Sequence, residues 1–155
     1  SRRHWMTDLA DVKQKFVDVL KADSTLASLL GNDASGQVPI YKEWPMGKMM
    51  WLPEVTVTDI VDHGEVSGLN DAFDGSKRYE WDHVLIQVDV WAKTAQSRDS
   101  VSSRIKKALL KALTDFRAIG VALSAPEILT LNEARRLIFR HSLRYRAFFV
   151  TEAPT

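Results

Sequence analysis

Apolar residues recur along this chain with two different spacings, and each spacing predicts a type of element. The helical spacing of three or four residues predicts an amphipathic helix over about 8–22 and a short helical turn that ends at Gly31. The same spacing returns at about 97–100 and continues to Phe116, which predicts a second long helix. The chain is therefore expected to contain two main helices.

Alternation of apolar and polar positions with a period of two predicts the strands. The clearest strand runs from Trp81 to Ala92, where β-branched residues occupy every second position: Val84, Ile86, Val88 and Val90. Further strands are expected at about 38–41, 54–61, 127–132 and 136–151. Gln87 and Asp89 make the other face of the clearest strand partly polar, which is typical of a sheet covered on one side only.

The order of these elements predicts an α+β fold, with a mostly antiparallel sheet and two main helices packed on one face. No repeat or linker interrupts the order, so we expect a flexible N-terminus at 1–7 and a single domain at 8–155. Residues 62–80 hold three glycines and many polar residues. This composition predicts a long loop or arm within the domain.

Composition and charge exclude several classes of protein. The chain has 155 residues, of which 45% are hydrophobic and 26% charged, so disordered and low-complexity classes are excluded. Cysteine is absent, and no apolar run approaches the roughly 18–20 residues of a membrane span, so no membrane partner is expected. Residues 1–80 carry a net charge of −4 and residues 81–155 carry +5. Such a split suits head-to-tail packing of identical subunits, and two ordinary solvated faces are the alternative.

Known catalytic and metal-binding patterns are missing from the sequence. The four histidines lie at no spacing typical of metal ligands, and neither a phosphate-binding glycine loop nor a Gly-X-Ser-X-Gly motif occurs. His63, beside Asp62 and Glu65, is conceivable as a weak metal or base site, but a solvated histidine is the favoured interpretation. We therefore expect no catalytic residue, no metal and no cofactor.

Two sets of residues are candidates for contacts with partners. The first is aromatic and apolar, and lies in or near the irregular segments: Trp44, Met46, Met49, Met50, Trp51, His63, Leu69, Phe73 and Tyr79. Met and Trp are enriched in interface cores, although such a loop can also fold over its own core. The second is a basic face for DNA, a lumen or a neighbour: Arg135, Arg136, Arg140, Arg144 and Arg146. Guanidinium groups bind phosphates and carboxylates, and a solvated sheet face is the alternative.

Several segments, taken in order, carry a resemblance that covers about 8–151. They are ADSTLASLLG at 22–31, VPIY at 38–41, LPEVTV at 52–57, HVLIQVDVWA at 83–92 and YRAFFV at 145–150. Their order and spacing resemble the tail-completion or tail-terminator proteins of long-tailed bacteriophages.

The resemblance implies a structural virion protein that forms a ring, expected to have six subunits, at the head-proximal end of the tail. Such a ring terminates the tail tube, contacts the tube protein and the head-side connector, and lets DNA pass through its lumen without sequence-specific binding. It would be assembled in the host cytoplasm and located in the virion. The alternatives are another head–tail connector of the neck, a nucleic-acid-binding α/β module that uses the basic face, and an enzyme centred on His63.

Overall fold

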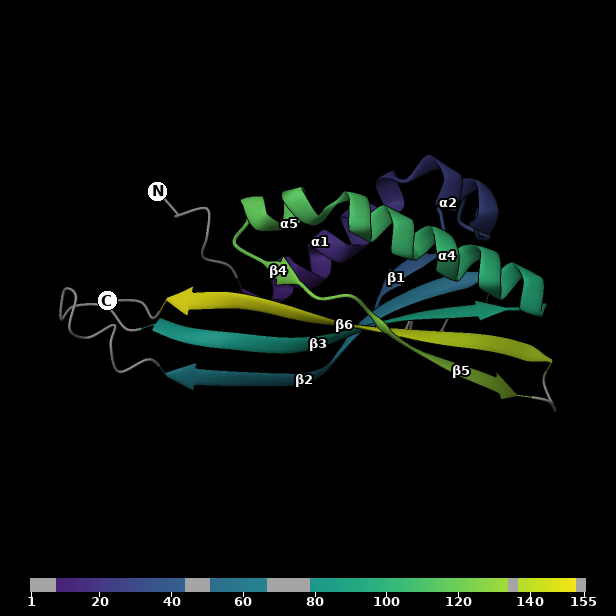
Figure 1. The fold of residues 1–155 in the computed structure, drawn as a ribbon. Coiled ribbons are helices and arrows are strands. Elements are labelled where there is room, and N and C mark those ends of the chain that lie inside the picture. The colour runs from purple at the N-terminus through teal and green to yellow at the C-terminus, as the bar shows by residue number, and fades with distance from the viewer. Residues whose placement is uncertain (1–7, 44–50, 67–78, 134–136, 153–155) are drawn as a thin grey trace.

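All described helices lie on one face of a six-stranded sheet, and no described helix covers the other face (Figure 1). The computed structural model describes residues 8–43, 51–66, 79–133 and 137–152. The N-terminal segment 1–7, expected to be flexible, lies outside these ranges. The α+β class, with a mostly antiparallel sheet and two main helices on one face, is confirmed.

The sheet is mixed, with one parallel pair of strands. Its strands are β1 (Ile40–Lys42), β2 (Glu54–Val66), β3 (Tyr79–Ala92), β4 (Ala122–Leu123), β5 (Glu127–Glu133) and β6 (Ile138–Glu152). β1, β2, β3 and β6 lie in that order, and β4 and β5 both pair with the remaining edge of β6. Only the β1–β2 pair is parallel. The alternation pattern predicted all of these strands except the short β4.

Two long helices and two short ones make up the described part of the helical layer. They are α1 (Leu9–Ala22), α2 (Ser24–Leu30), α4 (Ala95–Lys111) and α5 (Leu113–Ala118). α4 begins before the expected 97–100 because the Thr94 side chain caps it, accepting a hydrogen bond from the backbone N–H of Ser97 at 3.1 Å. The expected long helix is also divided at Ala112, which lies between α4 and α5.

The core lies between the helices and one row of residues on the two central strands. This row alternates with the other face and is buried: Val84, Ile86, Val88 and Val90 on β3, and Leu143, Tyr145, Ala147 and Phe149 on β6. Phe16 of α1 is fully buried at its centre, with its ring centroid 5.1 Å from that of Phe116 and 5.7 Å from that of Tyr145. Edge-to-face aromatic pairs of this kind add about 0.5–1.5 kcal/mol to the free energy of burial.

The expectation of a loop over 62–80 is wrong at both ends. β2 continues to Val66 and β3 begins at Tyr79, with Asp62 opposite Val84 and Gly64 opposite Asp82. These residues form strands because β3 is itself paired with β6 along its whole length, so ladder pairing outweighs the weak strand propensity of glycine and acidic residues. Residues 67–78 lie outside the described ranges.

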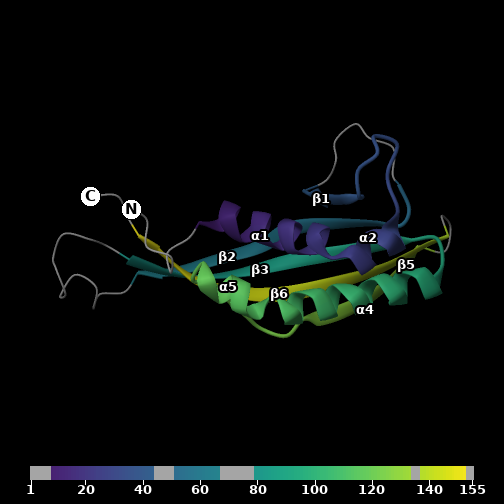
Figure 2. The same ribbon diagram turned by 90° about the horizontal axis from the view of Figure 1, so that it is seen from above.

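The two halves of the chain occupy opposite sides of the molecule. The half with net charge −4 builds α1, α2, β1 and β2, at one edge of the sheet. The half with net charge +5 builds α4, α5 and the strands β4, β5 and β6 at the other edge. Figure 2 shows this arrangement from above, with α1 and α2 toward β2 and with α4 and α5 toward β6. The charge split in the sequence therefore becomes a lateral split between the two sheet edges.

Asp23 joins the two sides of the helical layer. Its carboxylate accepts a hydrogen bond from the backbone N–H of Leu26 at 2.8 Å, which caps α2, and two from the Arg104 guanidinium on α4, at 2.9 and 2.8 Å. Bonding to Arg104 is the main reason that the pKa of Asp23 lies below its ordinary value of 3.8. The bond to Leu26 acts in the same direction, and burial opposes both.

Replacing Asp23 by Asn tests this ion pair, because Asn still caps a helix but carries no charge. We expect Asp23→Asn to lose about 1–2 kcal/mol in free energy of unfolding at pH 7. Since folding lowers the pKa of Asp23, the stabilisation is present above its ordinary pKa of 3.8 and is lost as the pH falls below it.

Urea unfolding at pH 7 and at about pH 2.5 measures the effect, and the difference between variant and wild type should shrink at the lower pH. Asp18→Asn is the control, because the Asp18 carboxylate bonds only within α1, to Gln14. Equal stability of Asp23→Asn and wild type at pH 7 would contradict the prediction.

Candidate interaction surface

The face of the sheet opposite the helices, which we call the outer face, carries every second residue of β3 and β6. On β6 these residues are Arg140, Ser142, Arg144, Arg146 and Phe148, whose chain neighbours are mostly buried beneath the helices. The facing residues on β3 are Trp91, Asp89, Gln87, Leu85 and His83. Three members of the predicted basic face therefore share one surface with a carboxylate, an amide and several aromatic rings.

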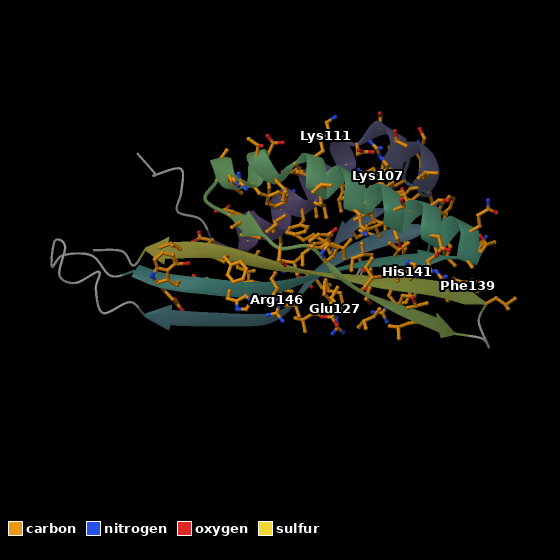
Figure 3. The ribbon with its side chains drawn as sticks, viewed as in Figure 1. Lys107, Lys111, Glu127, Phe139, His141 and Arg146 are labelled. Carbon is orange, nitrogen blue, oxygen red and sulfur yellow. The ribbon has the colours of Figure 1, made fainter. Side chains whose placement is uncertain are left out.

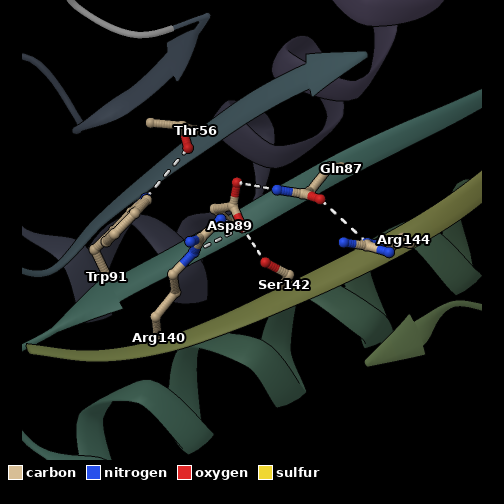
Figure 4. A network of polar contacts seen from close by, with 7 residues as sticks. All are labelled: Thr56, Gln87, Asp89, Trp91, Arg140, Ser142 and Arg144. Carbon is tan, nitrogen blue, oxygen red and sulfur yellow. Dashed lines mark hydrogen bonds and ion pairs between the residues drawn. The ribbon is translucent and has the colours of Figure 1, made fainter. Parts of the chain in front are cut away.

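Asp89 is the centre of a polar network on the outer face (Figure 4). It is only 3% exposed, and one of its oxygens accepts hydrogen bonds from Arg140 Nη2 at 2.9 Å and Nε at 3.2 Å. The Ser142 hydroxyl donates to the same oxygen, and Gln87 Nε2 donates to the other at 2.8 Å. The carboxylate is thus buried with its charge paired and both of its oxygens hydrogen-bonded.

Arg140 also covers the aromatic ring beside Asp89. Its guanidinium carbon lies 4.3 Å from the centroid of the Trp91 ring, which is the distance of a cation–π contact. Trp91 Nε1 donates to the Thr56 hydroxyl of β2 at 3.3 Å, so the group links β2, β3 and β6. Arg140 is therefore engaged within the subunit, with its side chain 24% exposed.

Arg144 and Arg146 keep their positive charge toward solvent. Arg144 Nε donates to Gln87 Oε1 at 3.2 Å, and Arg146 Nη1 donates to His83 Nε2 at 3.1 Å. Neither partner is a carboxylate, and Arg146 is exposed (Figure 3). These two side chains are available to carboxylates or phosphates of a partner. Arg135 and Arg136 lie outside the described residues.

Exposed aromatic rings form what we call the distal patch, on the outer face where β3 begins and β6 ends. Trp81 is 58% exposed and Phe148 is 45% exposed, and the His83 ring stacks on Phe148 with centroids 4.6 Å apart. A shallow cavity of about 280 Å³ adjoins both rings and reaches Arg117 and Val121. This patch was not predicted from the sequence, because Trp81 and Phe148 lie on different strands and come together only through the pairing of β3 with β6.

Three of the predicted apolar anchors lie in described residues, and Trp51 lies at the opposite end of β2 from the other two. Trp51 is 39% exposed and precedes β2, where its backbone N–H donates to the buried Glu54 carboxylate at 3.3 Å. His63 lies nine residues further along β2 than Glu54, roughly 30 Å away, and is paired opposite His83. Tyr79 begins β3 at that same end of the sheet. The remaining predicted anchors lie outside the described residues: Trp44, Met46, Met49, Met50, Leu69 and Phe73.

A serine, a histidine and an aspartate meet on the helical side of the sheet. Ser102 Oγ of α4 lies 2.7 Å from His141 Nδ1, and Asp99 Oδ1 lies 3.7 Å from His141 Nε2. Ser102 is only 4% exposed, and the distance to Asp99 exceeds that of a hydrogen bond. A hydrolytic site needs an accessible nucleophile and an oriented base. This group is therefore better explained as a structural contact between α4 and β6 than as a catalytic site.

Two further observations concern other functions. Within the described ranges, no group of three or more histidine or acidic side chains is placed to hold a metal ion. None of the helices described is both long and apolar enough to cross a membrane.

Comparison with solved structures shows a similarity of fold, and comparison of the sequence alone shows no match. No protein-family model matches this sequence, and no curated protein matches it. A chain in the solved structure described as "Virion of native gene transfer agent (GTA) particle" is similar, with a TM-score of 0.50 and 18% sequence identity. The match covers 87% of this chain and 91% of that chain. At this level of identity the similarity concerns the fold, and it extends over nearly the whole of both chains.

Removing Asp89 should leave the mostly buried Arg140 charge unpaired. We expect Asp89→Ala to lose about 3 kcal/mol in free energy of unfolding, and the double variant Asp89→Leu/Arg140→Met to regain much of it, because no charge then lacks a partner. Chemical denaturation measures both values. Asp115→Ala, at an exposed position of α5, serves as control and should change stability by no more than about 0.5 kcal/mol. A loss below about 1 kcal/mol for Asp89→Ala would contradict the prediction.

Because His141 is partly buried in its contact with α4, the free energy of unfolding should fall in mild acid. Burial, with help from the Arg98 charge and against the Asp99 charge, lowers the pKa of His141 below 6.5. The unfolded chain then binds the proton more tightly, so stability decreases as the pH falls through 6.5, by at most about 1.4 kcal/mol per pH unit. The other residues that face His141 are uncharged: Ser102, Val90 and Thr130.

Thermal unfolding between pH 7.5 and about pH 5 tests this sign, and His141→Gln should flatten the profile relative to wild type. Lys21→Gln, which removes an exposed positive charge at the end of α1, controls for net charge. The same slope in His141→Gln and wild type would refute the assignment.

Proposed function

We propose that this chain is a structural virion protein that forms a ring at the head-proximal end of a phage tail, where it terminates the tail tube and joins it to the head connector. The observation that carries the proposal is the similarity of fold to a chain of a gene transfer agent virion, over 87% of this chain and 91% of that one. Such similarity supports a virion protein of this fold, and the ring rests on the surfaces described next.

The charge distribution supports head-to-tail contact between identical subunits. The acidic half of the chain forms the β1–β2 edge and the basic half forms the β4–β5–β6 edge. When copies are placed edge to edge with the same orientation, the side built by the acidic half of one copy faces the side built by the basic half of the next, although the edge strand β5 itself carries Glu127 and Glu133. A heterologous contact of this kind closes into a ring when its rotation fits, and six subunits is the number that we propose.

The backbone at the two edges is also suited to such a contact. β1 pairs only with Val55, Thr56 and Val57 of β2, so β2 from Thr58 onward has no neighbour on that side among the described strands. β5 pairs with β6 on one side, and no described strand pairs with its other side. Exposed strand edges carry unpaired N–H and C=O groups that a neighbouring subunit can bind.

The outer face supplies contacts for a neighbouring subunit and for DNA. In the proposed ring, the distal patch with Trp81 and Phe148 is an apolar contact for a neighbouring subunit. Arg144 and Arg146 are the described members of the basic face left for DNA in the lumen, which they would contact through phosphates without reading sequence.

The two alternative functions, a neck connector and a nucleic-acid-binding module, would use these surfaces in different ways. Another connector of the neck has a similar fold and differs in which partners bind its ring. A nucleic-acid-binding module would need the basic face, yet Arg140 is neutralised by Asp89 there. A DNA affinity that falls steeply with salt would favour the module over the ring.

Charge introduced into the distal patch should weaken assembly without unfolding the subunit. We expect wild type to form rings at micromolar concentration, and Trp81→Lys/Phe148→Lys to associate at least about tenfold more weakly, because aromatic anchors dominate interface energy. Native mass spectrometry and light scattering measure the association, and circular dichroism checks the fold.

The matched control is Leu29→Lys, an exposed leucine on α2 with 41% exposure, which should leave the ring intact. A wild-type chain that stays monomeric at high concentration, and is absent from any ring in assembled particles, would rule out the proposed function.

A further inference from the structure

An apolar groove lies on the β6 side of the subunit, apart from the distal patch. It lies between α4 and the connection from β4 to β5 and has a volume of about 490 Å³. Its apolar lining includes Leu110, Leu113, Leu123 and Pro126, and Leu110 is 69% exposed. A groove of this size and character is typical of a binding site for apolar side chains.

Tyr145 closes the inner side of the groove. The residue is 3% exposed and belongs to the lining of the groove. Its hydroxyl is buried, and within the described chain it has no hydrogen-bond partner. The side of the groove toward the core is therefore tightly packed and largely apolar.

Two lysines in the lining of the groove favour an occupant with negative charge. Lys106 and Lys107 of α4 are exposed and belong to the lining of the groove, and Figure 3 shows Lys107 projecting from α4. No carboxylate belongs to the lining. The apolar lining and the two lysines together favour a segment that combines apolar and acidic residues.

One segment of this chain outside the described residues has that composition. Residues 69–75 contain Leu69 and Phe73 as apolar groups, Asp71 and Asp74 as acids, and no basic residue. The segments 1–7 and 44–50 contain no acidic residue and carry basic ones instead. Charge complementarity therefore favours 69–75 over the other two segments.

The topology favours a groove on another copy. β2 runs away from α4 to Val66, and β3 returns from Tyr79, so the chain leaves and re-enters the sheet at the end remote from the start of α4 (Figure 1). The segment is attached through β2, at the acidic edge, whereas the groove lies at the basic edge beyond β6. Edge-to-edge contact in the proposed ring places the β2 edge of one copy beside the groove of the next.

The geometry points to docking of residues 69–75 of one copy in the groove between α4 and the β4–β5 connection of the neighbouring copy. Leu69 and Phe73 enter the apolar lining, and the two aspartates face Lys106 and Lys107. This inference rests on the proposed ring and adds to it the contact that ties successive subunits together.

Cysteine cross-linking tests the docking directly, because the natural chain contains no cysteine. A tagged Phe73→Cys chain is assembled with an untagged Leu110→Cys chain and oxidised mildly. We expect a disulfide-linked pair of tagged and untagged chains to form at least about tenfold faster than with Leu29→Cys, an exposed leucine of α2 remote from the groove lining.

Charge reversal is the second arm of the experiment. Lys106→Glu/Lys107→Glu in the Leu110→Cys chain should slow cross-linking at least about tenfold, and adding Asp71→Lys/Asp74→Lys to the Phe73→Cys chain should restore it. Lys21→Glu/Lys93→Glu, at two exposed positions outside the groove lining, is the matched control and should leave the rate unchanged.

The outcomes separate the docking from the ring. Rings that form normally, with Phe73→Cys linking to Leu110→Cys no faster than to Leu29→Cys, would overturn the docking and leave the proposed function standing. In a chain carrying both cysteines, a bond formed only within one chain would also overturn it, because the groove would then hold the chain's own segment. Absence of any ring, measured before oxidation, would refute the proposed function and the docking with it.

Discussion

The antiparallel pairing of β3 with β6 is the constraint on which the rest of the structure depends. The two strands are paired over 14 consecutive positions, from Tyr79–Glu152 to Ala92–Phe139, and every second residue turns to the same face. A slip of one residue would move core positions such as Ile86 to solvent and bring arginines beneath the helices, so the register is strongly specified. Because both strands are longer than the helices above them, the same pairing also extends the sheet beyond the core.

The outer face shows how the side of the sheet that no described helix covers keeps a defined surface. Asp89, Arg140 and Ser142 form a polar cluster across the central pair, and the guanidinium group covers Trp91. Such a network is stable only when each member has a partner, since a lone buried charge is costly. The basic face is consequently divided: one arginine holds the subunit together, while Arg144 and Arg146 remain available to other molecules.

The same fold order also separates charge. Chain halves of opposite net charge come to lie at opposite sheet edges because β3, near the middle of the sequence, is also near the middle of the sheet. A subunit with unlike edges suits heterologous contacts, which can continue around a ring. The groove beneath α4 lies at the basic edge, and the acidic segment at 69–75 is carried by a hairpin from the acidic side, so both features fit one direction of assembly.

The sequence by itself determined the class of fold and most of its elements, because periods of two and of about 3.6 residues record which face of each element is buried. It also showed the charge split and the lack of familiar catalytic motifs. Only the tertiary structure decided that 62–66 is strand, that Arg140 belongs to a buried network, and that Trp81 and Phe148 share an exposed patch. Strand pairing brings residues such as Asp89 and Arg140 together across 51 positions of sequence. Contacts of that range depend on register and topology, which local patterns do not encode.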